Sequence, residues 1–297
     1  MPYKKLEFTN AAGQKLSARL DFPPDDKPSA YALFAHCFTC SKNIKAAAHI
    51  SRALTVAGIA VFRFDFTGLG ESEGDFGDTN FSSNVEDLVT AAEFMTQNYE
   101  GPKILIGHSL GGAAVLQAAA KIPSSLAVIT IAAPADPNHV SLALGDATEI
   151  IERRGEAKVD LAGRTFKIKK QFLDDLEEQN QQGKIAQLKK ALLVFHSPVD
   201  LTVSINEAET IYRTAKHPKS FVSLDDVSVE VHHDRQHVKD CEGCDAEPRK
   251  LEVLQKYVTL KGDLSEQERQ RLLEIADRCP VHQTLHGDLA IRTELID

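Results

Sequence analysis

Short apolar segments alternate with amphipathic helical segments over the first 224 residues of this 297-residue chain, and this alternation constrains the fold most strongly. Six apolar runs are expected to be strands: Tyr31–Ala35, Ala60–Phe64, Lys103–Gly107, Leu126–Ala133, Ala191–Phe195 and Ser220–Leu224. Short runs that are apolar on both faces are typical of parallel strands covered by helices. We therefore expect an α/β domain built on a mostly parallel sheet.

The segments between these runs show the apolar spacing of amphipathic helices. The three stripes are Ile50, Ala53, Leu54 and Ala57; Val85, Leu88, Val89, Ala92 and Met95; and Ala208, Ile211, Tyr212 and Ala215. Residues 4–22 read as a hairpin that turns at residues 11–13. Residues 134–187 interrupt the alternation with a polar, helix-rich segment and a small hairpin near residues 160–164. We expect this insertion to be a lid, the alternative being a solvated helical excursion.

Residues 227–297 have a different character, and we place the domain boundary after Asp226. Residues 227–231 alternate apolar and polar side chains, as a half-exposed strand does. Further strands are expected at residues 251–260 and 289–295. Ser265 and Glu268 form a capping box that opens a helix, which Pro280 ends. The tail is therefore predicted to be a small α+β module.

Composition narrows the class of protein. The net charge of −9 argues against a nucleic-acid-binding protein, which usually presents a basic face. The chain lacks a run of eighteen apolar residues and its start lacks an apolar leader segment, so we expect neither a membrane span nor a secretory signal, and a cytoplasmic location. The five cysteines are expected to be reduced thiols there.

Two cysteine pairs have C-x-x-C spacing, Cys37 with Cys40 and Cys241 with Cys244. Four thiolates suggest a zinc site, but about two hundred residues separate the pairs, unlike the spacing in a zinc ribbon. We therefore expect no metal and no other cofactor.

The segment Gly107-His108-Ser109-Leu110-Gly111 matches the pattern G-x-S-x-G, between an apolar strand and an alanine-rich helix. In this pattern the serine sits on a strained strand-to-helix turn, where flanking glycines avoid clashes. Ser109 is therefore the predicted nucleophile, and the Leu110 amide, at a helix start, is a predicted donor to a developing oxyanion. The alternative is a glycine turn that happens to contain a serine.

A second oxyanion donor is expected from the loop after an earlier strand. His36, Cys37 and Phe38 follow the strand that ends at Ala35, and the Phe38 amide is the best candidate by position. For His36 and Cys37 we favour structural packing of that loop over direct chemistry.

Asp200 is the predicted acid of a catalytic triad. It follows the strand Ala191–Phe195 and comes after Ser109 in chain order, as the acid does on this kind of scaffold. Its position corresponds to the carboxyl edge of the sheet, where α/β active sites lie. The alternative is an aspartate that only stabilises a turn.

These segments resemble bacterial fusion proteins in which an α/β hydrolase is joined to an OsmC-like domain. The resemblance is carried by Phe34–Lys42, Phe64–Ser72, the Ser109 turn and His217–Asp226, and in the tail by His233–Cys241 and Cys279–Leu285. It implies an α/β-hydrolase fold that acts on small esters or related acyl substrates through a serine. OsmC-like domains are thiol peroxidases that form intertwined dimers, so the resemblance also implies a possible homodimer through the tail.

The chain departs from that family in two places. The family's general-base histidine would fall at position 229, which is Val229 here. The final hydrolase helix and the first half of the OsmC-like part, with its peroxide-attacking cysteine, are also missing, as if a stretch between about Asp226 and Val227 were deleted. Cys279 matches the family's resolving cysteine.

His232 and His233 are candidate substitutes for the missing base. They lie a few residues beyond position 229, but a strand would carry them about 3.3 Å per residue away from the site. Three functions therefore stay open: a serine hydrolase, a hydrolytically weak or inactive scaffold, and, disfavoured for want of the attacking cysteine, a thiol peroxidase.

Overall fold

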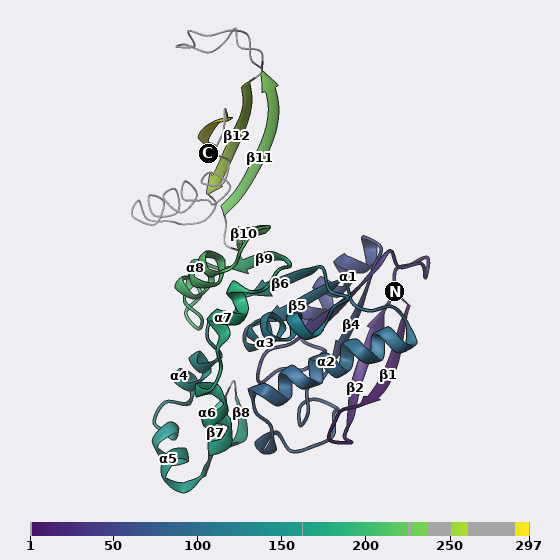
Figure 1. Cartoon of the computed structure of the whole chain (residues 1–297), viewed down its shortest axis with the longest axis vertical. Helices are drawn as coiled ribbons and strands as arrows, with labels where there is room; N and C mark the ends of the chain where they lie inside the picture. Colours follow the sequence, from purple (N-terminus) through teal and green to yellow (C-terminus); the bar gives the residue numbers. More distant parts are fainter. Residues whose placement is uncertain (1, 162, 225–226, 237–250, 261–288, 297) are drawn as a thin grey trace. The chain divides into compact units, whose positions relative to one another are not determined.

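The computed structural model describes residues 2–161 and 163–224, together with the backbone of residues 227–236, 251–260 and 289–296 (Figure 1). The chain divides into two units, one ending at Lys219 and one beginning at Ser220. The predicted helix that opens at Ser265 lies outside the described residues.

Seven strands of an eight-stranded sheet form the centre of the first unit, and the eighth strand of the sheet begins at the boundary residue Lys219. Its strands are β1 (Tyr3–Thr9), β2 (Lys15–Asp21), β3 (Ala30–Ala35), β4 (Ile59–Phe64), β5 (Ile104–His108), β6 (Ala127–Ile131), β9 (Ala191–His196) and β10 (Lys219–Ser223), in the order β1-β2-β4-β3-β5-β6-β9-β10. The five central strands are all parallel to one another; they are β4, β3, β5, β6 and β9. The predicted hairpin β1–β2 adds two antiparallel strands at one edge. The mostly parallel sheet predicted from the alternation is confirmed.

Helices cover both faces of this sheet (Figure 1). They are α1 (Lys45–Val56), α2 (Phe81–Asn98), α3 (Leu110–Ala118) and α8 (Ile205–Thr214), with short 3₁₀ turns η1 (Phe76–Asp78) and η2 (Ala119–Lys121). Helix α2 begins at Phe81 because the Asn80 side chain accepts from the Ser83 amide while the Ser83 hydroxyl accepts from the Asn80 amide, a complete capping box.

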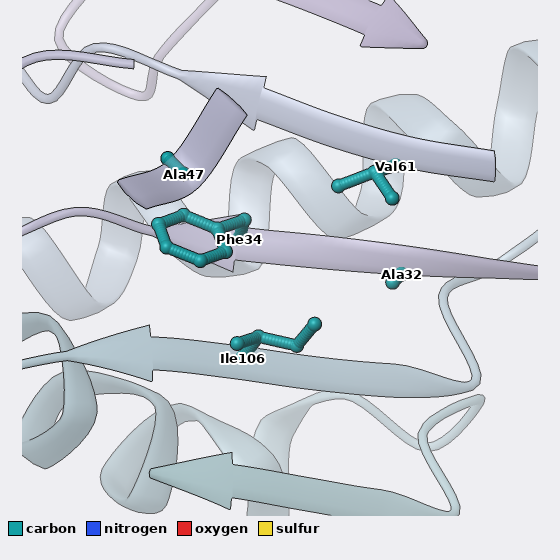
Figure 2. Packing of buried hydrophobic residues seen from close by; sticks show 5 residues of the cluster. All are labelled: Ala32, Phe34, Ala47, Val61 and Ile106. Atoms are coloured by element: carbon teal, nitrogen blue, oxygen red, sulfur yellow. The ribbon is translucent and has the colours of Figure 1, made fainter. Parts of the chain in front are cut away.

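A cluster of buried apolar side chains lies between helix α1 and the sheet. Ala32 and Phe34, two residues apart on β3, point to the same face and meet Val61 of β4, Ile106 of β5 and Ala47 of α1 (Figure 2). All five are at most 1% exposed, and full burial of a side chain such as Phe34 contributes about 2 kcal/mol. This packing holds the carboxyl ends of β3 and β5 in register.

The insertion between β6 and β9 folds as a short helical layer with one hairpin. Its elements are η3 (Pro137–Val140), α4 (Ser141–Leu144), α5 (Ala147–Arg154), β7 (Glu156–Leu161), β8 (Arg164–Lys169), α6 (Lys170–Glu177) and α7 (Gln181–Ala186). The predicted small hairpin is present as the antiparallel pair β7–β8. Helix α5 ends at Gly155, whose φ of +84° suits glycine.

The second unit contains a three-stranded sheet of β11 (Val227–Gln236), β12 (Leu251–Leu260) and β13 (Leu289–Ile296). Strand β12 lies in the middle, antiparallel to β11 and parallel to β13. Strand β11 runs five residues beyond the predicted end at Val231, so His232 and His233 lie within it. None of the described helices is long and apolar enough to cross a membrane.

Candidate active site

Ser109 occupies a sharp turn between β5 and α3. Its φ of +54° and ψ of −128° lie in a region that residues with a Cβ rarely adopt, at a cost of about 1–3 kcal/mol. The Ser109 amide donates to Ile131 O (2.9 Å) and the Gly112 amide donates to Ser109 O (2.8 Å), and these bonds hold the turn. Its position after β5 puts Ser109 at the carboxyl edge of the sheet.

Three glycines allow the chain to pack tightly around this turn. A Cβ on Gly107 would lie 2.5 Å from Gly112 Cα, and one on Gly112 would overlap the Ala133 side chain. A Cβ on Gly111 would overlap the carbonyl oxygen of His36. Most of these neighbours are backbone atoms, which cannot rotate away. The G-x-S-x-G motif predicted glycine at positions 107 and 111. The need for Gly112 becomes visible only in the fold.

The contact between Gly111 and His36 brings the two predicted oxyanion donors to the same region. Leu110 is the first residue of α3, and amides in the first turn of a helix have no acceptor within the helix. Within the described part of the chain, the Phe38 amide likewise makes no hydrogen bond to a protein acceptor. Both donors are therefore available to an anion beside Ser109.

His36 orients the peptide that carries the Phe38 amide. Its ring is buried, and burial is the main reason that its pKa falls to about 4, against opposing effects of the Cys37 carbonyl and Asp65. The neutral ring accepts from the Phe66 amide at Nε2 (3.4 Å), so the proton sits on Nδ1, which donates to Cys37 O (2.7 Å). The structural role expected for His36 is thus confirmed.

Cys37 and Cys40 are joined by a disulfide, with their Cα atoms 5.3 Å apart. The expectation of five reduced thiols is therefore wrong for this pair. Composition could not foresee the bond, which depends on a local turn that brings the two Cα atoms into the range disulfides require. The pair offers no thiolates for zinc, while Cys241, Cys244 and Cys279 lie outside the described residues. No metal-binding cluster of His, Cys, Asp or Glu occurs among the described residues.

Asp200 follows β9 and is held by its own turn. Its Oδ1 accepts from the amides of Thr202 (2.8 Å) and Val203 (2.9 Å), while Oδ2 lies 3.9 Å from His196 Nε2. The aspartate therefore stabilises a turn with one oxygen and leaves the other for a second partner. Strand β9 is two strands from β5 in the sheet, so Asp200 and Ser109 share its carboxyl edge.

No histidine of the first unit that the structure describes is hydrogen-bonded to the Ser109 hydroxyl. The Ser109 hydroxyl makes no hydrogen bond to any described residue. His196 is fully buried with Nε2 on Val203 O (2.7 Å), and His139 Nε2 lies 2.9 Å from Thr202 O. Burial lowers the pKa of His108, against the opposing charge of Asp200. His232 and His233 lie on β11 of the second unit and stay candidates.

The insertion packs on the loop that carries Phe38. The Phe38 ring lies between Phe76 of η1 and Phe172 of α6, with ring centroids 5.0 and 5.1 Å away. Arg164 of β8 donates to Thr39 O (3.3 Å). The insertion is therefore in contact with the loop that carries Phe38.

A buried ion pair that sequence reasoning missed supports the same loop. Lys42 and Asp65 are almost fully buried, with Lys42 Nζ 2.5 Å from Asp65 Oδ2. Asp65 also accepts from the backbone amides of Lys42 (2.6 Å) and Glu71 (2.9 Å). The only signal in the sequence was a charged residue directly after the apolar run of β4.

Comparison with known proteins agrees with the fold. The family model described as "Serine aminopeptidase, S33" (Hydrolase_4) matches residues 27–153. Human monoglyceride lipase is 31% identical over 137 residues, which are 45% of this chain and 44% of the lipase. The rat mitochondrial palmitoyl-protein thioesterase ABHD10 is 32% identical over 105 residues, 35% of this chain and 34% of the thioesterase. The chain thus spans less than half the length of these curated relatives.

Among solved structures, the esterase domain of a Rhodothermus marinus protein is 53% identical, with a TM-score of 0.62, over 75% of this chain and 88% of that domain. Est1E from Butyrivibrio proteoclasticus, in its ferulic acid complex, has a TM-score of 0.61 at 21% identity over 74% of this chain and 88% of Est1E, and shows the fold alone. Because more than half of the aligned residues are identical to those of a solved esterase domain of which most is covered, the chain belongs to the α/β-hydrolase family.

Proposed function

We propose that this chain is a serine hydrolase of carboxylic esters and related acyl compounds, with Ser109 as its nucleophile. The observation that carries the proposal is the strained conformation of Ser109 beside two amides, of Leu110 and Phe38, that lack protein acceptors. A serine held in that conformation presents its hydroxyl above the sheet edge, as acyl transfer requires.

In the proposed reaction the Ser109 Oγ attacks the acyl carbonyl carbon and its proton passes to a base. The Phe38 and Leu110 amides donate to the oxyanion that forms, which in known enzymes is worth several kcal/mol per donor. The base then protonates the leaving alcohol, and water releases the acyl group from Ser109. Asp200 Oδ2 would orient the base, for which His232 and His233 are the candidates.

The proposed substrate class rests on the relatives and on the loop. The relatives are a monoglyceride lipase, a palmitoyl-protein thioesterase and an esterase domain, and all three names denote acyl transfer to water. Phe38, Phe76 and Phe172 form an aromatic cluster directly at the proposed donor. We therefore favour small esters and thioesters whose acyl group is apolar.

A fluorophosphonate probe tests the proposal, because it reacts with activated serine hydroxyls. Peptide mapping after labelling of the folded protein should place the adduct on Ser109, and the Ser109→Ala variant should not be labelled. Turnover of p-nitrophenyl acetate and butyrate should vanish in the same variant. Absence of labelling in correctly folded protein would exclude an activated Ser109.

A second candidate function is a hydrolytically weak scaffold, favoured by the absence of a hydrogen bond between the Ser109 hydroxyl and any described base. His232→Ala and His233→Ala, made singly, separate the two. A completed triad predicts that one of them loses about 10³–10⁴-fold in kcat. A scaffold predicts slow ester turnover that neither variant changes.

For residues 227–297 we propose an OsmC-like remnant, left by an internal deletion, that joins two copies of the chain. Among the described residues, strands β11 and β13 are the outer strands of its sheet, and an unpaired strand edge favours pairing with another chain. Light scattering should then report a dimer. Thiol peroxidase activity is disfavoured; if it existed, Cys279→Ser would abolish hydroperoxide consumption. A cytoplasmic location completes the proposal, and cell fractionation tests it.

A further inference from the structure

The Cys37–Cys40 disulfide encloses the residue that carries the proposed oxyanion donor. Phe38 and Thr39 are the two residues between the cysteines, and the Cys40 amide donates to Cys37 O (3.1 Å) to close a turn around them. The S–S bond therefore adds a covalent link to a turn that one backbone hydrogen bond closes. A typical hydrogen bond of this kind contributes only about 1 kcal/mol.

The direction of the Phe38 amide is coupled to this closure through a single peptide plane. The carbonyl of Cys37 and the N–H of Phe38 belong to the same planar trans peptide and point in opposite directions. Two donors hold that carbonyl, His36 Nδ1 at 2.7 Å and the Cys40 amide at 3.1 Å. Of the two, the Cys40 amide is held in position by the disulfide.

Both cysteines are partly exposed, in contrast to the buried residues His36 and Phe38 beside them. A reductant thus has access to the bond. In a reducing compartment, such as the cytoplasm proposed for this chain, disulfides are usually transient and take part in catalysis or redox sensing.

We propose that Cys37 and Cys40 form a reversible redox site, oxidised in the state that holds the Phe38 amide ready for an oxyanion and reduced by a dithiol. The proposal rests on the proposed hydrolase function. It adds a modification site and its chemical partner, a small dithiol or a dithiol protein.

The exchange with the dithiol is balanced. One thiolate of the reductant attacks a sulfur of the Cys37–Cys40 bond, forms a mixed disulfide and releases the other cysteine, which takes up a proton. The second thiol of the reductant then displaces the remaining cysteine. Two electrons and two protons pass to Cys37 and Cys40, and the reductant leaves as a disulfide.

Reduction should lower kcat more than it changes KM, because the oxyanion exists only during the reaction. Removal of one oxyanion donor in a known protease costs about 10²–10³ in kcat. A donor that is loosened and not removed should cost less, and we expect a loss of about tenfold in kcat with less than a twofold change in KM.

The test compares oxidised, dithiothreitol-reduced and reoxidised protein. Alkylation with mass spectrometry should trap Cys37 and Cys40 only after reduction. Hydrogen exchange in the peptide spanning residues 36–42 should become faster by about tenfold, and kcat for p-nitrophenyl butyrate should fall and then recover on reoxidation. The Cys37→Ser/Cys40→Ser variant should resemble the reduced protein and ignore dithiothreitol. The matched control Cys241→Ser/Cys244→Ser should respond as the wild type does.

The outcomes separate this proposal from the hydrolase function. Free thiols at Cys37 and Cys40 after mild oxidation would overturn the redox site while leaving the hydrolase function intact. Unchanged hydrogen exchange and unchanged kcat on reduction would do the same. Faster exchange on reduction in a protein that never turns over ester would support the redox site and overturn the hydrolase. Hydrogen exchange is measured on the wild type, so the test remains valid even if the double variant folds poorly.

Discussion

Gly111 lies directly under the carbonyl oxygen of His36, so that a Cβ on Gly111 would overlap this oxygen and would lie 2.6 Å from Ala35 O. This contact joins the start of α3 to the loop after β3. Through this contact the segments that carry the Leu110 and Phe38 amides, far apart in the sequence, lie side by side. A methyl group at this position must push the two segments apart.

Gly111→Ala should therefore reduce ester turnover more than it reduces stability. Overpacking of this kind typically costs about 1–3 kcal/mol, whereas loss of a donor costs about 10²-fold or more in kcat. Gly155→Ala is the control, because Gly155 has a positive φ but nothing within 4 Å of an added Cβ. Urea unfolding and p-nitrophenyl ester kinetics report the two effects, and unchanged kcat in Gly111→Ala would contradict the donor pair.

His36 should make the protein less stable in acid. Burial holds its folded pKa at about 4, below the ordinary value of 6.5, so between these values the unfolded chain binds a proton that the folded chain does not. Stability from this group is complete above about pH 6.5 and falls, by up to about 3 kcal/mol, as the pH drops toward 4.

His36→Asn keeps a donor for Cys37 O and removes the titration. The variant should lose less stability than the wild type between about pH 7 and about pH 4.5 in urea unfolding. Asp65, Lys42 and His108 act on the same group and are present in both proteins, so the comparison isolates the imidazole. Equal acid losses in the two proteins would show that His36 does not carry the effect.

Asp200→Asn should lower kcat without unfolding the loop. The amide oxygen of Asn still accepts from Thr202 and Val203, which now donate to Asp200 Oδ1. The substitution removes the negative charge that a histidine base would need. The equivalent substitution in a known triad lowers kcat about 10⁴-fold. Asp146→Asn, at an exposed residue of the insertion, is the control. A kcat equal to the wild type would favour the weak scaffold.

Lys42→Met should destabilise the first unit strongly. It removes the ammonium group from a buried carboxylate, Asp65, and breaking a buried pair in this way costs about 3–5 kcal/mol. Glu71 also binds Lys42 (2.6 Å), but its side chain is 64% exposed. Glu71→Gln should consequently leave the urea midpoint nearly unchanged. Similar midpoints for both variants would mean that Asp65 tolerates the loss of its partner.

Periodicity predicted most elements of the first unit, because strands and helices that bury one face leave that spacing in the sequence. It did not predict that β4 lies between β2 and β3, since a helical connection permits more than one neighbour. The end of β11 was also missed by five residues, because the alternation of apolar residues stops at Val231 while the backbone pairing continues to Gln236.

Part of the candidate site could also be predicted from the sequence and part could not. The positions of Ser109 and Leu110 follow from a local motif, whose strained turn needs particular residues at fixed spacing. The role of His36 depends on the approach of Phe66, and the need for Gly112 depends on Ala133, a residue of a different segment. Contacts between distant segments leave no periodic trace. The sequence therefore indicated a structural role for His36 without identifying Phe66 as its partner, and the need for Gly112 could not be predicted.

The ring of Phe38 packs between Phe76 and Phe172 while its own backbone amide is the proposed donor. In the proposed function, acyl-chain preference and turnover rate are consequently linked. An engineer who reshapes the aromatic cluster to admit a bulkier acid will also shift the amide that steadies the reacting oxygen, so gains in selectivity at Phe76 or Phe172 will come with changes in speed.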